Sequence, residues 1–463
     1  MLHRLALLGG LLSVTLLAVP ERGRDLPLAP ASFTVGGKKA IPIDFDSVHL
    51  ELELDPSSGT AIGRCSISFY AKETGYPLMD LVPSVRSVRL NGVDLGSQGL
   101  PTVTAPQNAT QLRMVNAEVQ ANTGGDLEIE FTLSSNEITF SNGGVRMVWA
   151  MSDVGADRGF LERYACSNLE FDHFPMEMQV SITGQRTAHQ IFTNGQLVFT
   201  GVGSYYVYFP YYFTTSSFYF HITNRPVSVK KETWQGKQAL IPITVYGGTN
   251  VNVAQGLSTA KRVLAELESD YGPYAHKSLV VYLTPDGGGM EHAGATITSL
   301  GALGHEITHS WFARGVMPAD GNAGWIDEAI ASWRDNGYPR GNPSLQGNMS
   351  TLSGFATYAR STPMAAYTAG ASLMSRWDGL FSGGLKPVLR EVFSQAQKNT
   401  VSTPSFQALL EQISGKSLDD YFRRYVYGGM RQVTALQLPA EPFPHGQTRH
   451  PRPFTRAEIQ ALR

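Results

Sequence analysis

The spacing of apolar residues changes near residue 230, and this change constrains the fold more than any other feature of the sequence. From about 41 to 225, apolar and polar residues alternate with a period of two, as in VHLELELDP at 48–56, and polar turns such as Asn91-Gly92 separate the runs. Alternation with such turns is typical of antiparallel strands joined by hairpins. Beyond residue 230, apolar residues recur at helical spacing, as in 251–272. The sequence therefore predicts an α+β protein of several domains.

The two patterns also predict where the domains lie. We expect a β-rich N-terminal domain, an antiparallel saddle or sandwich, at 41–225, and a mainly helical second domain at 226–430. A Pro-rich and irregular tail follows at 431–463. Within the second domain, 301–315 and 325–337 have the spacing of helices.

The composition excludes several classes of protein. The chain of 463 residues has 37 Lys and Arg against 39 Asp and Glu, without a long basic block, so nucleic acid is not an expected partner. With 16% charged and 10% aromatic residues, the chain lacks the composition of a disordered protein. An aromatic-rich stretch at 205–220 is predicted to form strands packed beneath the neighbouring domain, with a substrate platform as the alternative.

Residues 1–20 have the layout of a signal peptide, with Arg4 ahead of an apolar run at 5–19. We expect export, to the periplasm or outside the cell, with an uncleaved anchor or a misassigned start as the alternatives. No later segment has the length and apolarity of a transmembrane helix, so none is expected in the mature chain. The two cysteines, Cys65 and Cys166, form one disulfide at most, and two buried free thiols are equally compatible with the sequence.

Residues 305–309 read His-Glu-Ile-Thr-His inside the first of the two predicted helices. Side chains at i and i+4 share one face of a helix, so His305 and His309 can bind the same metal ion. Imidazole nitrogens suit Zn²⁺, and a catalytic zinc site needs three protein ligands and one open position. Glu306, beside the first histidine, can act as the general base toward a zinc-activated water.

Glu328 is the predicted third ligand. Eighteen residues separate it from His309, and the glycine-rich turn at 320–324 lets its helix fold back toward the first one. Two histidines and a glutamate are typical of catalytic zinc, so we expect one Zn²⁺ per chain, held by His305, His309 and Glu328. A chance match on a surface helix is the alternative, and the placement of Glu328 argues against it.

Together, HEITHSWF, the eighteen-residue gap and WIDEAIASW resemble the gluzincin zinc metallopeptidases of the aminopeptidase N and leukotriene hydrolase type, peptidase family M1. The resemblance covers roughly 40–430. It implies a β saddle domain followed by a thermolysin-like zinc domain. Because the chain ends soon after the expected zinc domain, we predict a compact form that lacks the family's large helical C-terminal domain.

A second element of the resemblance lies just upstream of the zinc motif. The segment GGMEH at 288–292 is similar to the family's G-x-M-E-N loop, whose glutamate binds the free α-amino group of the substrate. This role passes to Glu291, because a fixed carboxylate pairs with an ammonium group and excludes blocked chains. His292 stands where the family has Asn, and we assign it to the substrate loop and not to zinc. The other expected substrate-binding residues of this loop are Gly288, Gly289 and Met290.

A third element, AYTAGASLM at 366–374, is similar to a helix start whose tyrosine stabilises the oxyanion in the family. The resemblance gives this role to Tyr367, since a phenol can donate a hydrogen bond to developing negative charge. An ordinary packed tyrosine is the alternative.

These observations predict a zinc-dependent aminopeptidase whose partners are peptides with a free N-terminus. Glu306 would act as general base and Glu291 as anchor of the substrate amine. Three alternatives stay open from the sequence: a zinc endopeptidase, an epoxide hydrolase on the same site, and a non-catalytic binding protein on an inherited fold. The complete set of ligands and base argues against the last of these.

Overall fold

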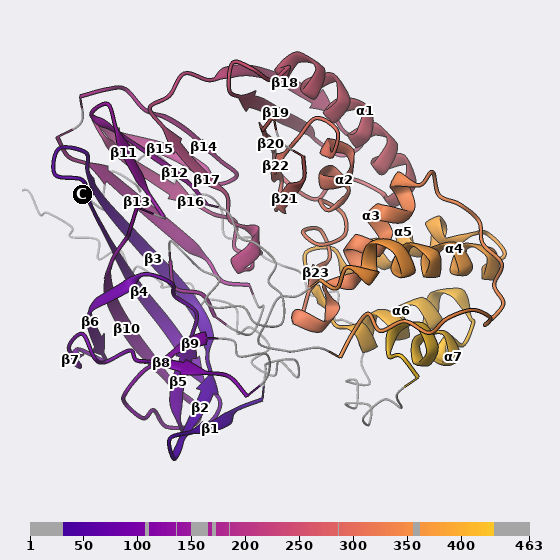
Figure 1. Ribbon diagram of the computed structural model, residues 1–463, viewed down its shortest axis with the longest axis horizontal. Helices are drawn as coiled ribbons and strands as arrows, with labels where there is room; N and C mark the ends of the chain where they lie inside the picture. Colours follow the sequence, from indigo (N-terminus) through magenta and orange to yellow (C-terminus); the bar gives the residue numbers. More distant parts are fainter. Residues whose placement is uncertain are drawn as a thin grey trace, which may run out of the picture.

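The fold comes from a computed structural model, which describes residues 31–106, 111–135, 137–149, 165–168, 173–184, 186–285, 287–354 and 362–429. Figure 1 shows two regions side by side, one built of strands in the first half of the chain and one rich in helices in the second half. The predicted signal peptide and the predicted Pro-rich tail lie outside the described residues, and the domain boundaries stay predictions.

The first region contains seventeen strands and one short 3₁₀ helix among the described residues. Their bounds are β1 (Phe33–Val35), β2 (Lys38–Pro42), β3 (Asp44–Asp55), β4 (Thr60–Ala71), β5 (Tyr76–Met79), β6 (Ser84–Leu90), β7 (Val93–Asp94), β8 (Thr102–Thr104), β9 (Gln111–Met114), β10 (Thr123–Thr132), β11 (Thr139–Ser141), β12 (Gly144–Val148), β13 (Met176–Ile182), β14 (Gln190–Thr193), β15 (Gln196–Gly201), β16 (Ser204–Tyr208), η1 (Thr215–Ser217) and β17 (Phe220–Thr223).

These strands form three sheets. The largest has eight strands in the order β15-β16-β13-β3-β4-β10-β6-β7, and the others have the orders β1-β2-β5-β9-β8 and β11-β12-β17-β14. The predicted alternation is visible in β3, where Leu50 and Leu52 are buried in the core and Glu53 is exposed. The predicted hairpin is confirmed, because Asn91 and Gly92 join β6 to β7 with φ values of 51° and 78°. Positive φ at both central residues is the signature of a type I′ turn.

The prediction of a purely antiparallel sheet is wrong for two strand pairs. β13 runs parallel to β3, with Met176 opposite Val48, and β2 runs parallel to β5, with Ala40 opposite Tyr76. In both pairs, other strands intervene in the sequence, so a tight hairpin cannot join the partners, and a parallel pair needs a long crossover. The period of two reports which face of a strand is buried and says nothing about strand direction.

Most of the aromatic-rich segment 205–220 is buried, but the prediction of strands beneath the neighbouring domain holds only in part, because just the two ends of the segment lie in strands, β16 and β17. Phe213, Phe218 and Phe220 are at most 1% exposed in the main core of the first region. Tyr219 instead contacts the second region, where its hydroxyl hydrogen-bonds that of Tyr246. Tyr211 is 37% exposed and Tyr206 and Tyr208 are half-buried, so the alternative of a substrate platform stays a prediction.

The second region combines helices with a further sheet. Its elements are β18 (Ser228–Gln235), β19 (Leu240–Gly247), α1 (Val253–Tyr271), β20 (Leu279–Leu283), β21 (Gly289–His292), β22 (Ala295–Thr298), α2 (Leu303–Thr308), β23 (Met317–Pro318), η2 (Gly321–Ala323), α3 (Trp325–Asp335), η3 (Ala366–Gly370), α4 (Ala371–Leu380), α5 (Leu385–Ala396), β24 (Thr400–Val401), α6 (Thr403–Ser414), α7 (Asp419–Tyr421) and η4 (Phe422–Val426). The sheet has the order β18-β19-β20-β22-β21, which places β21 at its edge. Helix α2 lies between this edge and α3 (Figure 1).

Contacts between the two regions hold the edge strand β21 in place. The side chain of Asn194 donates hydrogen bonds to the carbonyl oxygens of Ser217 and Ala293, at 2.7 and 2.8 Å. The backbone N–H of Ala293, directly after β21, donates to the Ser217 carbonyl at 3.1 Å. The β-rich region therefore fixes the strand on which a substrate-binding loop was predicted.

Among the described residues, no helix is long and apolar enough to span a membrane. Cys65 and Cys166 are both buried and free, and the backbone N–H of Cys166 lies 3.5 Å from the Cys65 sulfur.

Candidate metal centre and active site

The two histidines of the predicted zinc motif lie at the end of a short helix. Helix α2 runs only from Leu303 to Thr308, and His309 follows as its C-terminal cap with φ −61° and ψ −16°. This backbone conformation is still helical, so His305 and His309 keep the i, i+4 relationship on one face. The predicted helix at 301–315 is too long, because Ala313 has a φ of 110°, which no helix accommodates.

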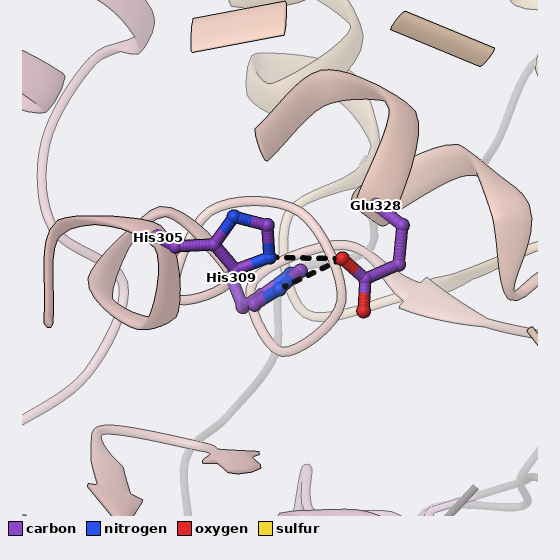
Figure 2. Close-up of side chains that lie close together, drawn as sticks. All are labelled: His305, His309 and Glu328. Atoms are coloured by element: carbon purple, nitrogen blue, oxygen red, sulfur yellow. Dashed lines mark hydrogen bonds and ion pairs between the residues drawn. The ribbon is translucent and has the colours of Figure 1, made fainter. Parts of the chain in front are cut away.

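Helix α3 presents Glu328 to both histidines. Glu328 Oε2 lies 2.9 Å from His305 Nε2 and 3.6 Å from His309 Nε2. Figure 2 shows one carboxylate oxygen of Glu328 facing a nitrogen of each ring. One ligand atom from each of the three residues falls in a cluster within 4.8 Å. Ligands bound about 2.0–2.2 Å from one zinc ion in tetrahedral geometry lie roughly 3.4 Å apart. The three residues therefore fit the ligand set of the zinc site that the sequence predicts.

The other nitrogen of each imidazole is held by an acceptor outside this cluster. His305 Nδ1 lies 2.7 Å from Asp335 Oδ2, and His309 Nδ1 lies 3.3 Å from the Phe312 carbonyl and 3.4 Å from Asp327 Oδ2. Such partners fix the ring orientation and leave Nε2 free to bind a metal ion. All three acceptors therefore orient both Nε2 atoms toward Glu328.

The charges around the cluster favour a cation. Burial lowers the pKa of His305, but hydrogen bonds to Asp335 and Glu328 outweigh burial and raise that pKa to about 9. Burial would raise the pKa of Glu328, but the charges of His309 and His305 and their hydrogen bonds together outweigh burial and hold the pKa well below its usual range. A site that retains protons on buried imidazoles in this way also stabilises a divalent cation that takes their place.

Glu306 lies beside the cluster with a free carboxylate oxygen. The residue is 6% exposed, and its Oε2 atom has no hydrogen-bond partner within the described part of the chain. Burial raises the pKa of Glu306 to about 7, against the lowering effect of His309. A buried carboxyl group that titrates near neutral pH suits a group that exchanges protons during a reaction.

The predicted substrate loop packs directly against this carboxyl group. A Cβ atom at Gly289 would lie 2.4 Å from the carboxyl carbon of Glu306, so any larger residue there would displace this carboxyl group. Gly288 has a φ of 91°, a conformation that also favours glycine. The two glycines therefore allow the start of β21 to approach Glu306 closely.

Glu291 and His292 point to opposite sides of β21, as successive residues of a strand do. Glu291 lies in a second cluster with Glu306 and His309, in which one ligand atom of each falls within 4.8 Å of the others. His292 is 1% exposed, and its ring lies 5.2 Å from that of Tyr219. The structure thus brings Glu291 to the site and buries His292 against the β-rich region, while Met290 is half-buried. Substrate contacts of the loop stay predictions.

Tyr367 lies next to the third metal ligand. Its hydroxyl donates a hydrogen bond to Glu328 Oε1 at 2.7 Å, and its ring stacks toward His305 with 6.3 Å between ring centroids. The residue belongs to η3, a single π-helical turn ahead of α4. Tyr367 therefore reaches the metal cluster, and its role toward an oxyanion stays a prediction.

Three residues of the site were not predicted from the sequence. Asp335 and Asp327 orient the histidines, and Arg314 donates to Glu291. Asp335 could have been found, because it lies seven residues after Glu328 and so on the same helix face. Arg314 has no such signal, since it follows a non-helical turn.

Comparisons with known proteins bear on the fold. No protein-family model and no curated protein matches the sequence. Among solved structures, the chain is similar to an M1 zinc metallopeptidase from Deinococcus radiodurans, with 17% identity and a TM-score of 0.59 over 87% of this chain and 96% of that chain. A mutant of that protein bound to a Tyr-Ser-Ala substrate gives the same values. Legionella pneumophila aminopeptidase A in complex with aspartic acid is similar at 14% identity and a TM-score of 0.59, over 84% of this chain and 51% of that chain.

The chain thus has the fold of the M1 zinc metallopeptidases, and its candidate metal ligands lie on or directly after helices α2 and α3. Within that fold, it is similar to the two-domain form, because a protein described as a two-domain M1 zinc metallopeptidase aligns over 97% of its own length. The TM-scores of 0.58 and 0.59 establish the fold, and at identities of only 14–18% the chemistry is argued from the site.

Proposed function

We propose that this protein is a zinc-dependent aminopeptidase that removes N-terminal residues from peptides. One observation carries the proposal: the predicted metal ligands, the predicted base and the predicted amine anchor form two clusters that share His309. In each cluster, one ligand atom of every residue lies within 4.8 Å of the others. A metal centre, a base and a carboxylate anchor this close together can contact the two ends of a single N-terminal residue. We further propose export for this protein, on the sequence of residues 1–20.

The residues of the site have complementary roles in this reaction. His305, His309 and Glu328 would hold one zinc ion, which when bound acts as a Lewis acid toward water and the peptide carbonyl. Glu306 accepts the proton of the attacking water and passes it to the leaving amine. Glu291 pairs with the substrate α-ammonium and aligns the first peptide bond. Tyr367 donates a hydrogen bond to the negative charge that develops on the carbonyl oxygen.

The proposal is tested with aminoacyl chromogenic substrates and their N-acetylated counterparts. We expect hydrolysis of the free-amine substrates only, loss of activity with a chelator, and recovery when Zn²⁺ is added back. Glu306→Gln is expected to lower kcat by about 10²- to 10⁴-fold while one zinc per chain is retained, because the base is lost and the ligands are not.

Glu232→Gln is the matched control, since Glu232 is an exposed residue that pairs with Lys261 on the surface. It should leave kcat and KM unchanged. Activity that survives chelation would contradict the proposed chemistry. Equal cleavage of free and acetylated substrates would instead identify an endopeptidase on the same metal site.

A further inference from the structure

Arg314 is a buried cation that the proposed reaction does not use. Its side chain is 7% exposed, and Nη2 donates to Glu291 Oε1 at 2.6 Å. Nε donates to the backbone carbonyl of Glu291 at 3.3 Å, so the guanidinium holds both the side chain and the main chain of this residue. Nη1 donates to Ser216 Oγ at 2.8 Å. A planar donor fork used in this way fixes its acceptor in one orientation.

The backbone after α2 delivers Arg314 to this position at a conformational cost. Ala313 has a φ of 110°, although it is not glycine. The N–H of Arg314 donates to the His309 carbonyl at 2.9 Å, and the N–H of Ala313 donates to the Val316 carbonyl at 2.9 Å. A non-glycine residue keeps such a conformation only where the surrounding structure imposes it. The turn therefore aims Arg314 back at β21 immediately after the second metal ligand.

The occupied oxygen of Glu291 leaves the other oxygen for a ligand. Glu291 is 15% exposed and clusters with the carboxylate of Glu306 within 4.8 Å. Two carboxylates at this distance repel one another, so an unheld Glu291 would turn away from the site. Arg314 balances this repulsion and prevents the rotation. The positive charge of Arg314 also repels an incoming ammonium group, but that group binds the Glu291 oxygen that Arg314 does not hold. Loss of Arg314 would cost more, because Glu291 would then no longer be oriented to accept the ammonium.

We propose that Arg314 is a positioning residue that holds Glu291 for the substrate α-ammonium and thereby sets the preference for a free N-terminus. The inference rests on the proposed aminopeptidase function and identifies what makes its amine anchor selective. Arg314 touches neither the predicted ligands nor the base through its side-chain hydrogen bonds. Its effect should therefore appear in recognition of the amine and not in the metal chemistry.

The β-rich region takes part in this positioning. Ser216, which accepts from Arg314, belongs to η1 and is 4% exposed. The neighbouring Ser217 carbonyl accepts from Asn194 and from Ala293, at 2.7 and 3.1 Å. The amine anchor is thus held from both sides, by the turn after α2 and by a helical turn of the first region.

Two zinc-binding inhibitors separate amine recognition from metal binding. Leucine hydroxamate carries the α-ammonium, and 4-methylpentanohydroxamate is the same molecule without it. The test is to determine both inhibition constants for the full-length zinc enzyme and for Arg314→Gln and Arg314→Lys. The wild type should prefer leucine hydroxamate, and Arg314→Gln should reduce that preference by at least about tenfold, the effect typical of a charge-assisted contact. The affinity of Arg314→Gln for 4-methylpentanohydroxamate should stay within about threefold of the wild-type value. The preference of Arg314→Lys for leucine hydroxamate should lie between those of the wild type and Arg314→Gln.

Arg113→Gln is the matched control, because Arg113 also holds backbone carbonyls, those of Leu81 and Pro83, within the β-rich region. It should leave both inhibition constants unchanged. An unchanged or increased preference for the ammonium in Arg314→Gln would overturn the inference, as would an equal loss for both compounds, which indicates general support of the site. A wild type that prefers neither compound would refute the aminopeptidase proposal instead.

Discussion

The two sides of the candidate site are built in different ways. On the metal side, α2 and its C-terminal cap supply His305 and His309, and α3, which packs directly on α2, supplies Glu328. On the substrate side, Glu291 comes from an edge strand, and its partners Arg314 and Ser216 come from a turn and from the other region of the molecule. The metal side depends on helical spacing, whereas the substrate side depends on tertiary contacts.

Because the two sides are built separately, zinc binding on the metal side and substrate recognition on the other side should be lost independently of one another. Loss of a metal-side residue should remove zinc and every activity that needs it. Loss of a substrate-side residue should leave zinc in place and change which molecules bind. Each prediction below tests this separation, and the first has the largest expected effect.

Replacing Glu328 with Ala should abolish zinc binding. The carboxylate is 7% exposed and is the only contributor from α3 to the metal cluster among the described residues. Its loss should cost more zinc affinity than the 10- to 100-fold that is typical for an outer partner. Zinc content after dialysis, measured by atomic emission, should fall from one per chain to near zero. Stoichiometric zinc in Glu328→Ala would show that the metal lies elsewhere.

Replacing Tyr367 with Phe tests whether this residue acts on the reaction or supports the metal ligands. If the hydroxyl stabilises the oxyanion, kcat should fall by about 10²- to 10³-fold, with zinc content and KM little changed. The observed hydrogen bond to Glu328 Oε1 offers a second role as support for the ligand. We expect the first outcome. Loss of zinc from Tyr367→Phe, with activity restored by excess zinc, would assign the residue to the metal side.

The raised pKa of His305 predicts how the stabilisation of the fold by bound zinc depends on pH. A basic group with a folded-state pKa of about 9, against an ordinary 6.5, stabilises the metal-free fold below pH 6.5 and loses that contribution as pH rises through 9. The loss is about 3 kcal/mol at most. Zinc-bound imidazoles carry no proton to lose, so the stabilisation by zinc should increase over this range. Urea unfolding of both forms at pH 6.5 and 9 measures it, and a constant difference would contradict the assignment.

The same contrast explains how much the sequence could predict. The strand region follows from alternation and from Asn91-Gly92, and the metal ligands follow from helical periodicity, because both signals are local. The parallel pairing of β13 with β3 and the end of α2 at Thr308 were not predicted, since each depends on contacts with distant segments. Arg314 was missed for the same reason: its acceptors, Glu291 and Ser216, lie 23 and 98 residues away.

The smallest effect is predicted for the carboxyl groups that contact the two histidines from outside the cluster, those of Asp335 and Asp327. Asp335→Asn should weaken zinc binding by about 10- to 100-fold, because its carboxylate lies 2.7 Å from His305 Nδ1 and orients a ligand with its charge. Asp327→Asn should weaken it less, since the Phe312 carbonyl still accepts from His309 Nδ1 at 3.3 Å. Burial also raises the pKa of Asp327 well above its usual range, so an amide resembles its protonated form. Competition with a chromophoric chelator gives both affinities. An equal or larger loss in Asp327→Asn would mean that this carboxyl group, and not the Phe312 carbonyl, orients the second histidine.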